Sequence, residues 1–259
     1  MLRPRIIPCL LVKNKGLVKT VKFGSFKYVG DPINAVKIFN EKEVDELIVL
    51  DIDATTTGIG PDFKMIQNLA AECRMPLCYG GGVKTVEQAK NIIGLGVEKV
   101  ALSAAVLEKP ALVTQIADEI GSQSVVAVLD VKKVLLGARY KVYTHNAKIN
   151  TGKCPIEFAQ TLEKLGVGEI VLNSIDNDGE MKGYDLALAK KIREAVNVPM
   201  TVLGGAGSLN DIGNLISIFG IVGAAAGSLF VFKGVYKAVL INYPNAAEKD
   251  NLIRVNYPY

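Results

Sequence analysis

Eight short apolar runs alternate with longer amphipathic segments along this chain of 259 residues. Each run is apolar through most of its length, which is typical of parallel strands covered on both faces. Helix-start signals lie between the runs, such as Asp31 before Pro32 and Thr85 three residues before Gln88. The eight alternations predict an α/β fold, a single (β/α)8 TIM barrel, with a doubly wound open sheet as the alternative. The runs are 5–12, 46–53, 76–82, 99–106, 124–131, 169–176, 199–205 and 220–228.

The two halves of the chain resemble each other at an offset of about 125 residues. LIVLDID, YGGGV and ALSAAV in the first half correspond to IVLNSID, LGGAG and AAAGS in the second, which pairs Ser103 with Ser228. We therefore expect one domain, residues 1–259, built from two (β/α)4 half-barrels of about 1–120 and 121–259. Paired halves of this kind bring two similar ligand sites to one rim.

Glycine-rich segments recur where predicted strands end, at 80–82, 178–179, 204–205 and 227–228. Backbone N–H groups at such turns can hold phosphate, and the N-terminus of a following helix adds about half a positive charge. Their symmetric recurrence predicts a substrate with two phosphates. Any single glycine fits a tight turn equally well.

Two aspartates end predicted strands on the rim where barrel enzymes place catalytic groups, Asp51 after the second strand and Asp130 after the fifth. Asp51 also fits the role of a loop cap. A basic segment follows the first strand and includes Lys19. A loop this basic can close over an anionic substrate, or it can be an ordinary solvated loop.

Four charged residues stand directly before strands at the opposite end of the barrel, Arg5, Glu46, Lys99 and Glu169. We call them the gate residues. An unpaired ion inside the barrel would cost several kcal/mol, so these groups must pair with one another or reach water. They form either a salt-bridge layer that closes the barrel or a polar gate for a small molecule.

Composition excludes several classes of site. The single histidine, His145, rules out three-histidine zinc sites and HExxH helices, and we expect no metal and no cofactor. His145 lies in a polar stretch and is expected to be solvent-exposed and incidental.

Four cysteines without a CxxC pair predict no disulfide, and a net charge of +4 predicts no nucleic-acid partner. Apolar stretches shorter than a membrane span predict a cytoplasmic protein with no membrane association.

The motifs RIIPCLLVKNKGLVK, LIVLDIDA, GGGV, VLDVKK, SIDNDGEMKGYD and LGGAG resemble the cyclase subunit of imidazole glycerol phosphate synthase across essentially the whole chain. That family is a (β/α)8 barrel that receives ammonia from a glutaminase subunit at its N-terminal face and passes it to a doubly phosphorylated substrate. The resemblance implies that Asp130 is one of two catalytic aspartates and that the gate residues admit ammonia. It also implies that the substrate is bound by Lys19, Asp51, Gly82, Ser103, Asp178, Gly179, Gly205, Gly227 and Ser228.

The second catalytic aspartate of that family is absent. The family's first strand reads CLDVK where this chain reads CLLVK, so Leu11 stands at the aspartate position, and the internal repeat also pairs Leu11 with Asp130. Losing one member of an acid/base pair typically costs about 10²- to 10⁴-fold in rate. Ser103 and Ala104 replace an Asn-Thr pair, and Leu203 replaces a small polar residue. The resemblance therefore implies an altered substrate pocket beside an intact ammonia entrance.

An altered substrate pocket beside an intact ammonia entrance is typical of a paralogue group found with surface-polysaccharide genes. The C-terminal stretch GSLFVFKGVYKAVLINYP also resembles that group. There, a glutaminase and a cyclase-like barrel supply ammonia to a separate amidotransferase that makes an acetamidino sugar for O-antigen lipopolysaccharide. We predict that this chain supplies ammonia in the same way, with a glutaminase and a sugar-modifying amidotransferase as its partners. The alternative is an active cyclase of histidine biosynthesis that forms imidazole glycerol phosphate and aminoimidazole carboxamide ribotide from the phosphoribulosyl formimino precursor and ammonia. A phosphate-sugar isomerase or aldolase would leave the gate residues unexplained.

Overall fold

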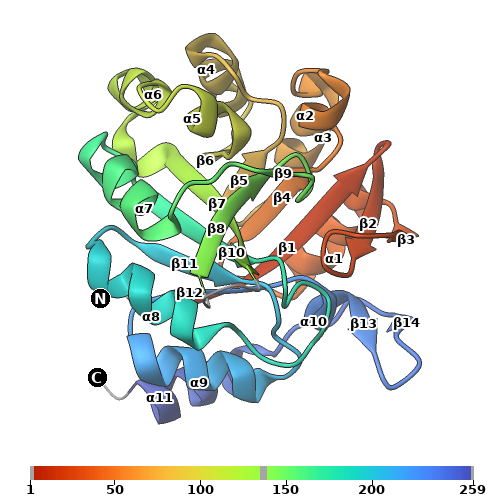
Figure 1. Cartoon of the computed structure of the whole chain (residues 1–259). Helices are drawn as coiled ribbons and strands as arrows, with labels where there is room; N and C mark the ends of the chain where they lie inside the picture. Colours follow the sequence, from red (N-terminus) through yellow and green to blue (C-terminus); the bar gives the residue numbers. More distant parts are fainter. Residues whose placement is uncertain (1–2, 135–138, 258–259) are drawn as a thin grey trace.

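The computed structural model describes residues 3–134 and 139–257, and within them eight parallel strands close into a barrel surrounded by helices (Figure 1). Each strand pairs with the next, and the last pairs with the first through Arg5–Pro8 and Gly223–Ala226. The predicted (β/α)8 barrel is confirmed, and this closing pair rules out the open sheet. The strands are β1 (Arg5–Lys13), β4 (Leu47–Asp51), β5 (Leu77–Gly80), β6 (Lys99–Leu102), β7 (Val125–Val134), β10 (Glu169–Ser174), β11 (Met200–Leu203) and β12 (Gly223–Ala226).

The helices begin where side chains satisfy free backbone N–H groups. Asp31 accepts from the backbone of Asn34 at 2.8 Å, and Thr85 and Gln88 form a reciprocal capping box, so both predicted helix starts are confirmed. Helices α9 and α11, each 11 residues long, fall well short of the ~20 residues of a membrane span, and no helix in the described part of the chain could cross a bilayer. The helices are α1 (Pro32–Glu41), α2 (Ala54–Thr57), α3 (Phe63–Glu72), α4 (Val86–Gly94), α5 (Ala104–Glu108), α6 (Leu112–Ile120), α7 (Pro155–Lys164), α8 (Leu186–Ala195), α9 (Leu209–Phe219), α10 (Ser228–Val231) and α11 (Ala246–Asn256), with a 3₁₀ turn at Ser122–Ser124.

Antiparallel strands extend the barrel at three places. The basic segment after β1 forms β2 (Gly16–Thr20) and β3 (Phe26–Gly30), and the chain after β7 forms β8 (Arg139–Thr144) and β9 (Ile149–Asn150). Leu11 pairs with Val18 in the first hairpin as Asp130 pairs with Tyr143 in the second, so the two hairpins occupy matching registers. A third hairpin, β13 (Phe232–Lys233) with β14 (Ala238–Val239), follows α10.

Two apolar layers result from the alternation of side chains along each strand. On β1, Ile6, Leu10 and Val12 face the helices, whereas Ile7 and Cys9 face the barrel interior. The interior column is apolar, and each buried aliphatic side chain in it contributes roughly 1.5–3 kcal/mol to stability. Its members are Ile7, Cys9, Ile48, Cys78, Ala101, Val126, Val128, Val171, Leu203 and Ala225, with Leu11 and Leu50 at one end.

Candidate functional site

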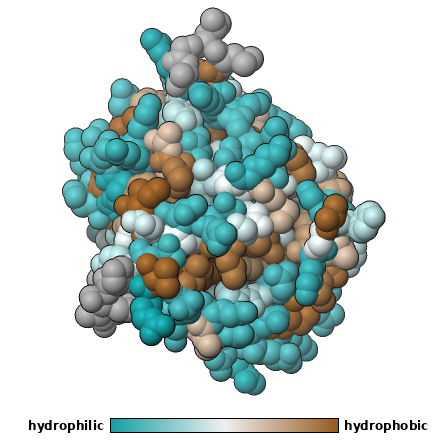
Figure 2. All heavy atoms as spheres, turned by 90° about the horizontal axis from the view of Figure 1, so that it is seen from below, coloured by the Kyte–Doolittle hydropathy of each residue, from teal (hydrophilic) through white to brown (hydrophobic). Residues whose placement is uncertain are grey.

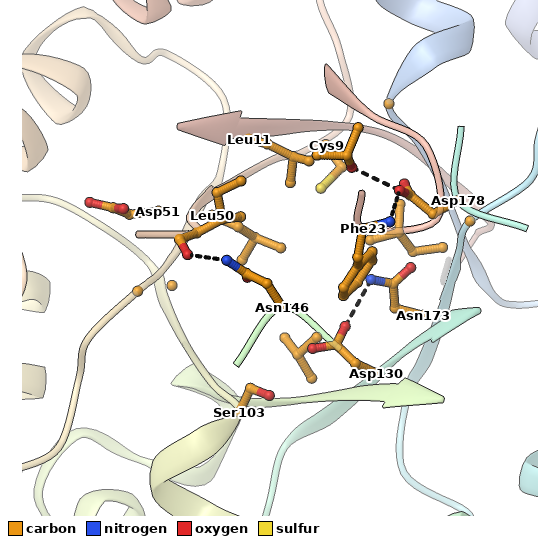
Figure 3. A pocket seen from close by; sticks show the side chains of 18 of the residues that line it. Cys9, Leu11, Phe23, Leu50, Asp51, Ser103, Asp130, Asn146, Asn173 and Asp178 are labelled. Carbon is orange, nitrogen blue, oxygen red and sulfur yellow. Dashed lines mark hydrogen bonds between the residues drawn. The ribbon is translucent and has the colours of Figure 1, made fainter. Parts of the chain in front are cut away.

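A cavity lies at the carboxyl ends of the barrel strands (Figure 3). All ten candidate catalytic and substrate-binding residues named from the sequence line it, although they come from eight different strands or strand ends. Leu11 lines the same cavity. The closed barrel explains this, because the carboxyl ends of its parallel strands meet at one rim. The ten are Lys19, Asp51, Gly82, Ser103, Asp130, Asp178, Gly179, Gly205, Gly227 and Ser228.

Asp130 is held in this cavity by Asn173 of the neighbouring strand β10. Asn173 lies in register with Asp130, and its Nδ2 donates a hydrogen bond to Asp130 Oδ1 at 2.9 Å (Figure 3). Burial raises the pKa of Asp130 to about 7, with Asn173 opposing the rise and the Asp178 charge adding to it. A carboxyl with such a pKa can both take and give a proton near neutral pH.

Asn173 is a site residue that the sequence reasoning missed. Its side chain is 5% exposed, and its Oδ1 is buried, with no hydrogen-bond donor among the described residues in reach. Because Nδ2 is committed to Asp130, Oδ1 is free to accept from a small ligand that carries N–H or O–H. The available signal was an asparagine directly after the apolar residues IVL of this strand run.

The opposite wall of the cavity is apolar. Leu11 lies in register with Leu50 of β4, just as Asp130 lies in register with Asn173 of β10. Figure 3 shows the two leucines across the cavity from the Asp130 and Asn173 pair. The two strand pairs therefore present corresponding positions with opposite chemistry. Leu11 and Leu50 cannot move a proton, whereas Asp130 is a titrating acid.

The β2–β3 hairpin closes against the second half of the barrel through Asp178. This carboxylate accepts from Thr20 Oγ1 at 2.7 Å and from the backbone N–H of Phe23 at 3.2 Å, and burial raises its pKa. Lys19, on β2, donates to the backbone oxygen of Cys9 at 2.6 Å, and burial lowers the pKa of its ammonium group. The segment predicted as a basic loop is thus a folded strand pair with Lys19 buried inside the site.

Asp51 caps a turn at the edge of the cavity. It accepts backbone hydrogen bonds from Asp53 at 3.0 Å and Ala54 at 3.2 Å, and in Figure 3 its side chain lies apart from the others that are labelled. Burial raises the pKa of its carboxyl group. Asp51 therefore caps the loop that follows β4, which is the alternative role that the sequence allowed for it.

The expected exposure of His145 is wrong. His145 is half-buried and lines the cavity, and its Nδ1 is buried with no partner among the described residues. The turn at 145–147 has positive φ angles at three successive residues and folds over the cavity, where Asn146 Nδ2 donates to Ile52 O at 2.9 Å. This contact spans 94 residues of sequence, so local polarity could not predict it.

Within residues 3–134 and 139–257 no cluster of three or more His, Cys, Asp or Glu side chains could hold a metal.

The gate residues form a ring of alternating charge at the amino end of the barrel interior. Arg5 pairs with Glu46 and, at 2.7 Å, with Glu169, while Lys99 lies 2.8 Å from each glutamate. Thr201 Oγ1 donates to Glu169 at 2.5 Å. Burial by itself would raise the pKa of Glu169, but Arg5 and Lys99 lower it to about 2. These ion pairs close the ring at the amino end of the barrel interior.

The chain matches the model of the Histidine biosynthesis protein family over residues 5–237. A Vibrio vulnificus (strain YJ016) protein named imidazole glycerol phosphate synthase subunit hisF3 is 59% identical over 98% of each chain. The subunit named hisF2 from Pseudomonas aeruginosa is 53% identical over 96% of this chain and 99% of its own. The subunit named HisF from Clostridium botulinum is 37% identical over 94% of this chain and 96% of its own.

Proposed function

This chain belongs to the family of imidazole glycerol phosphate synthase cyclase subunits, and from that membership we propose that it conducts ammonia rather than carrying out the cyclisation. In this proposal a glutaminase subunit docks at the N-terminal face and releases ammonia at the gate residues. The ammonia crosses the barrel and is used by a separate amidotransferase, which converts an acetamido group into an acetamidino group on a surface-polysaccharide sugar.

The pairing of Leu11 with Leu50 is the observation that carries the proposal. It leaves Asp130 facing an apolar wall where the family's reaction needs a second carboxyl group. Neither leucine can donate or accept a proton, so the loss of one acid/base partner is expected to cost about 10²- to 10⁴-fold in cyclisation rate. Ammonia that reaches this cavity would then be available for transfer elsewhere.

An apolar column of side chains between the two ends of the barrel supports conduction. Inward-facing positions on β10 run from Glu169 through Val171 to Asn173, and those on β1 run from Arg5 through Ile7 and Cys9 to Leu11. A strand rises about 3.3 Å per residue, so the distance along β1 from Arg5 to Leu11 is roughly 20 Å. An apolar column admits neutral ammonia far more readily than ammonium, because burying an unpaired charge is costly.

One observation favours the active cyclase as a second candidate. Asp178 lines the same cavity as Asp130, and its charge contributes to the raised pKa of Asp130. If Asp178 replaced the missing aspartate, the chain would still form imidazole glycerol phosphate. Its hydrogen bonds to Thr20 and Phe23 oppose this, because they hold the carboxylate in place as an acceptor.

Turnover of the phosphoribulosyl formimino substrate with excess ammonium chloride distinguishes the two candidates. We expect the wild-type chain to be at least 100-fold slower than an active cyclase subunit from the family, and Leu11→Asp to recover part of the rate. Leu11→Asn is the matched control, because asparagine has a shape similar to that of aspartate but no titrating group. This variant should recover none of the cyclisation rate. Wild-type turnover at the rate of an active cyclase would refute the proposal.

The glutaminase partnership is tested at the gate. In the complex with glutaminase and amidotransferase, Lys99→Ala should alter glutamine-dependent product formation and leave product formation from added ammonium chloride unchanged. Lys90→Ala, at a surface ion pair with Glu119, serves as the control. Equal effects of Lys99→Ala on both nitrogen sources would mean that the ring is only structural.

A further inference from the structure

The β13–β14 hairpin presents the most exposed apolar side chains of the described chain. Val235 and Tyr236, at its tip, are 95% and 97% exposed, and Leu240 on the returning segment is also exposed. Figure 1 shows the hairpin extending from the barrel beside α10, and Figure 2 shows a small brown group beside a pale outermost group at the same edge of the molecule. Scattered exposed apolar residues are normal, but a protruding apolar tip on an ordered hairpin is typical of an interaction site.

Backbone hydrogen bonds join the base of the hairpin to α10. Backbone hydrogen bonds join Leu240 to Val231 at 2.9 Å and Asn242 to Phe230 at 3.0 Å, while the strands pair through Phe232 and Val239. The tip is therefore held out from the barrel by a regular backbone ladder.

The hairpin is continuous with the wall of the cavity. Ser228 lines the cavity only four residues before β13 begins, and Phe26 of β3 lines it from the neighbouring hairpin. Lys27, next to Phe26, lies over the ring of Phe232 at 5.3 Å. The exposed ring of Tyr28 lies on the same β3 strand. A protein seated on these two hairpins would contact the same elements that line the cavity.

The charge of this surface indicates the chemistry of its partner. Lys233 and Lys237 flank the apolar tip, and Lys27 lies beside its base. In the part of the chain that the structure describes, none of these three lysines forms an ion pair with a carboxylate. An apolar centre with a basic border is complementary to an apolar groove bordered by acidic residues.

The match to the family model ends at residue 237, inside this hairpin. The relatives at 53% to 59% identity align over at least 96% of the chain, so their similarity continues beyond that point. The HisF subunit of Clostridium botulinum also aligns over 94% of this chain, so that alignment extends past residue 237 as well.

We propose that the β13–β14 hairpin, together with the outer face of β3, is the docking surface for the amidotransferase that consumes the ammonia. This proposal rests on the proposed function, because an active cyclase would use its ammonia inside the cavity. A stable interface needs about 800 Å² on each partner, more than one hairpin tip supplies, so β3 must contribute. The exposed aromatic Tyr236 is the expected anchor.

The test uses three purified proteins: this chain, its glutaminase, and the amidotransferase with its acetamido-sugar substrate. Val235→Ser combined with Tyr236→Ser should lower glutamine-dependent acetamidino formation at least 10-fold and abolish co-elution with the amidotransferase. Glutamine hydrolysis and amidination from ammonium chloride should be unchanged. Val255→Ser, at an exposed apolar position on α11, is the control and should change nothing. Because both tip side chains are almost fully exposed, the double variant should keep the wild-type circular dichroism spectrum.

The outcomes separate the docking proposal from the function on which it rests. Full glutamine-dependent amidination by the double variant, in a system where the wild-type chain works, refutes the docking surface alone. No dependence of amidination on the wild-type chain refutes the proposed function, and the docking proposal with it. Hairpin-dependent binding to phosphatidylglycerol vesicles, or a hairpin-dependent dimer, with normal amidination would assign the surface to a membrane or a second copy and overturn the proposal.

Discussion

Replacing Lys99 with methionine should destabilise the barrel by about 2–3 kcal/mol at neutral pH. The pKa of Glu169 falls from 4.5 to about 2 in the folded chain, and at 1.36 kcal/mol per unit this is about 3 kcal/mol of stabilisation. Arg5 and Lys99 share that stabilisation, and Lys99 also holds Glu46 at 2.8 Å. Glu169 is 4% exposed, so water cannot replace the lost cation effectively.

The sign of the pH dependence follows from the lowered pKa of Glu169. The stabilisation is complete above pH 4.5, where the carboxylate is ionised in both states, and is lost as the pH falls toward 2. Urea unfolding of wild type and Lys99→Met should therefore differ most at pH 7 and by less than half as much at pH 3. Lys90→Met, at an exposed ion pair, should show no measurable change. A difference that stays constant between pH 7 and pH 3 would refute the ion-pair reasoning.

Three further outcomes follow from the cavity. Asn173→Leu removes the donor to Asp130, so the pKa of Asp130 should rise above about 7, as measured by carboxyl ¹³C NMR; an unchanged titration would contradict the 2.9 Å contact. Leu11→Asp adds a second carboxyl to the cavity and should also raise the apparent pKa of Asp130, whereas Leu11→Asn should leave it near the wild-type value. Thr20→Val removes a hydrogen bond to a carboxylate and should cost about 1.5–3 kcal/mol in urea unfolding; a loss below about 0.5 kcal/mol would show that Asp178 does not hold the β2–β3 hairpin.

Much of the architecture could be read from one-dimensional patterns. An apolar run bounded by polar turns specifies a buried parallel strand wherever it falls, so all eight barrel strands overlap their predicted runs. The capping of α1 and α4 was equally local, because each cap joins residues three apart. The carboxyl ends of parallel strands share one rim, which is why residues chosen by their place at strand ends line one cavity.

The hydrogen-bond partners of the cavity side chains could not be predicted from local sequence patterns. Asn173 reaches Asp130 across 43 residues, and Asn146 reaches Ile52 across 94, which folds the turn containing His145 over the cavity. Such contacts depend on register and on the path of hairpins, which a polar stretch alone does not specify.

The sequence by itself determined the barrel, its repeat and the charge types at each end, because each is written in local composition and spacing. Its resemblance to the cyclase subunits identified the leucine in place of an aspartate. Only the tertiary structure decided that the gate residues close into one ring, that Leu11 faces Leu50 as Asp130 faces Asn173, and that Lys19 is buried. Strand register and barrel closure set those relations, since they place side chains from distant parts of the chain within a few ångströms of one another.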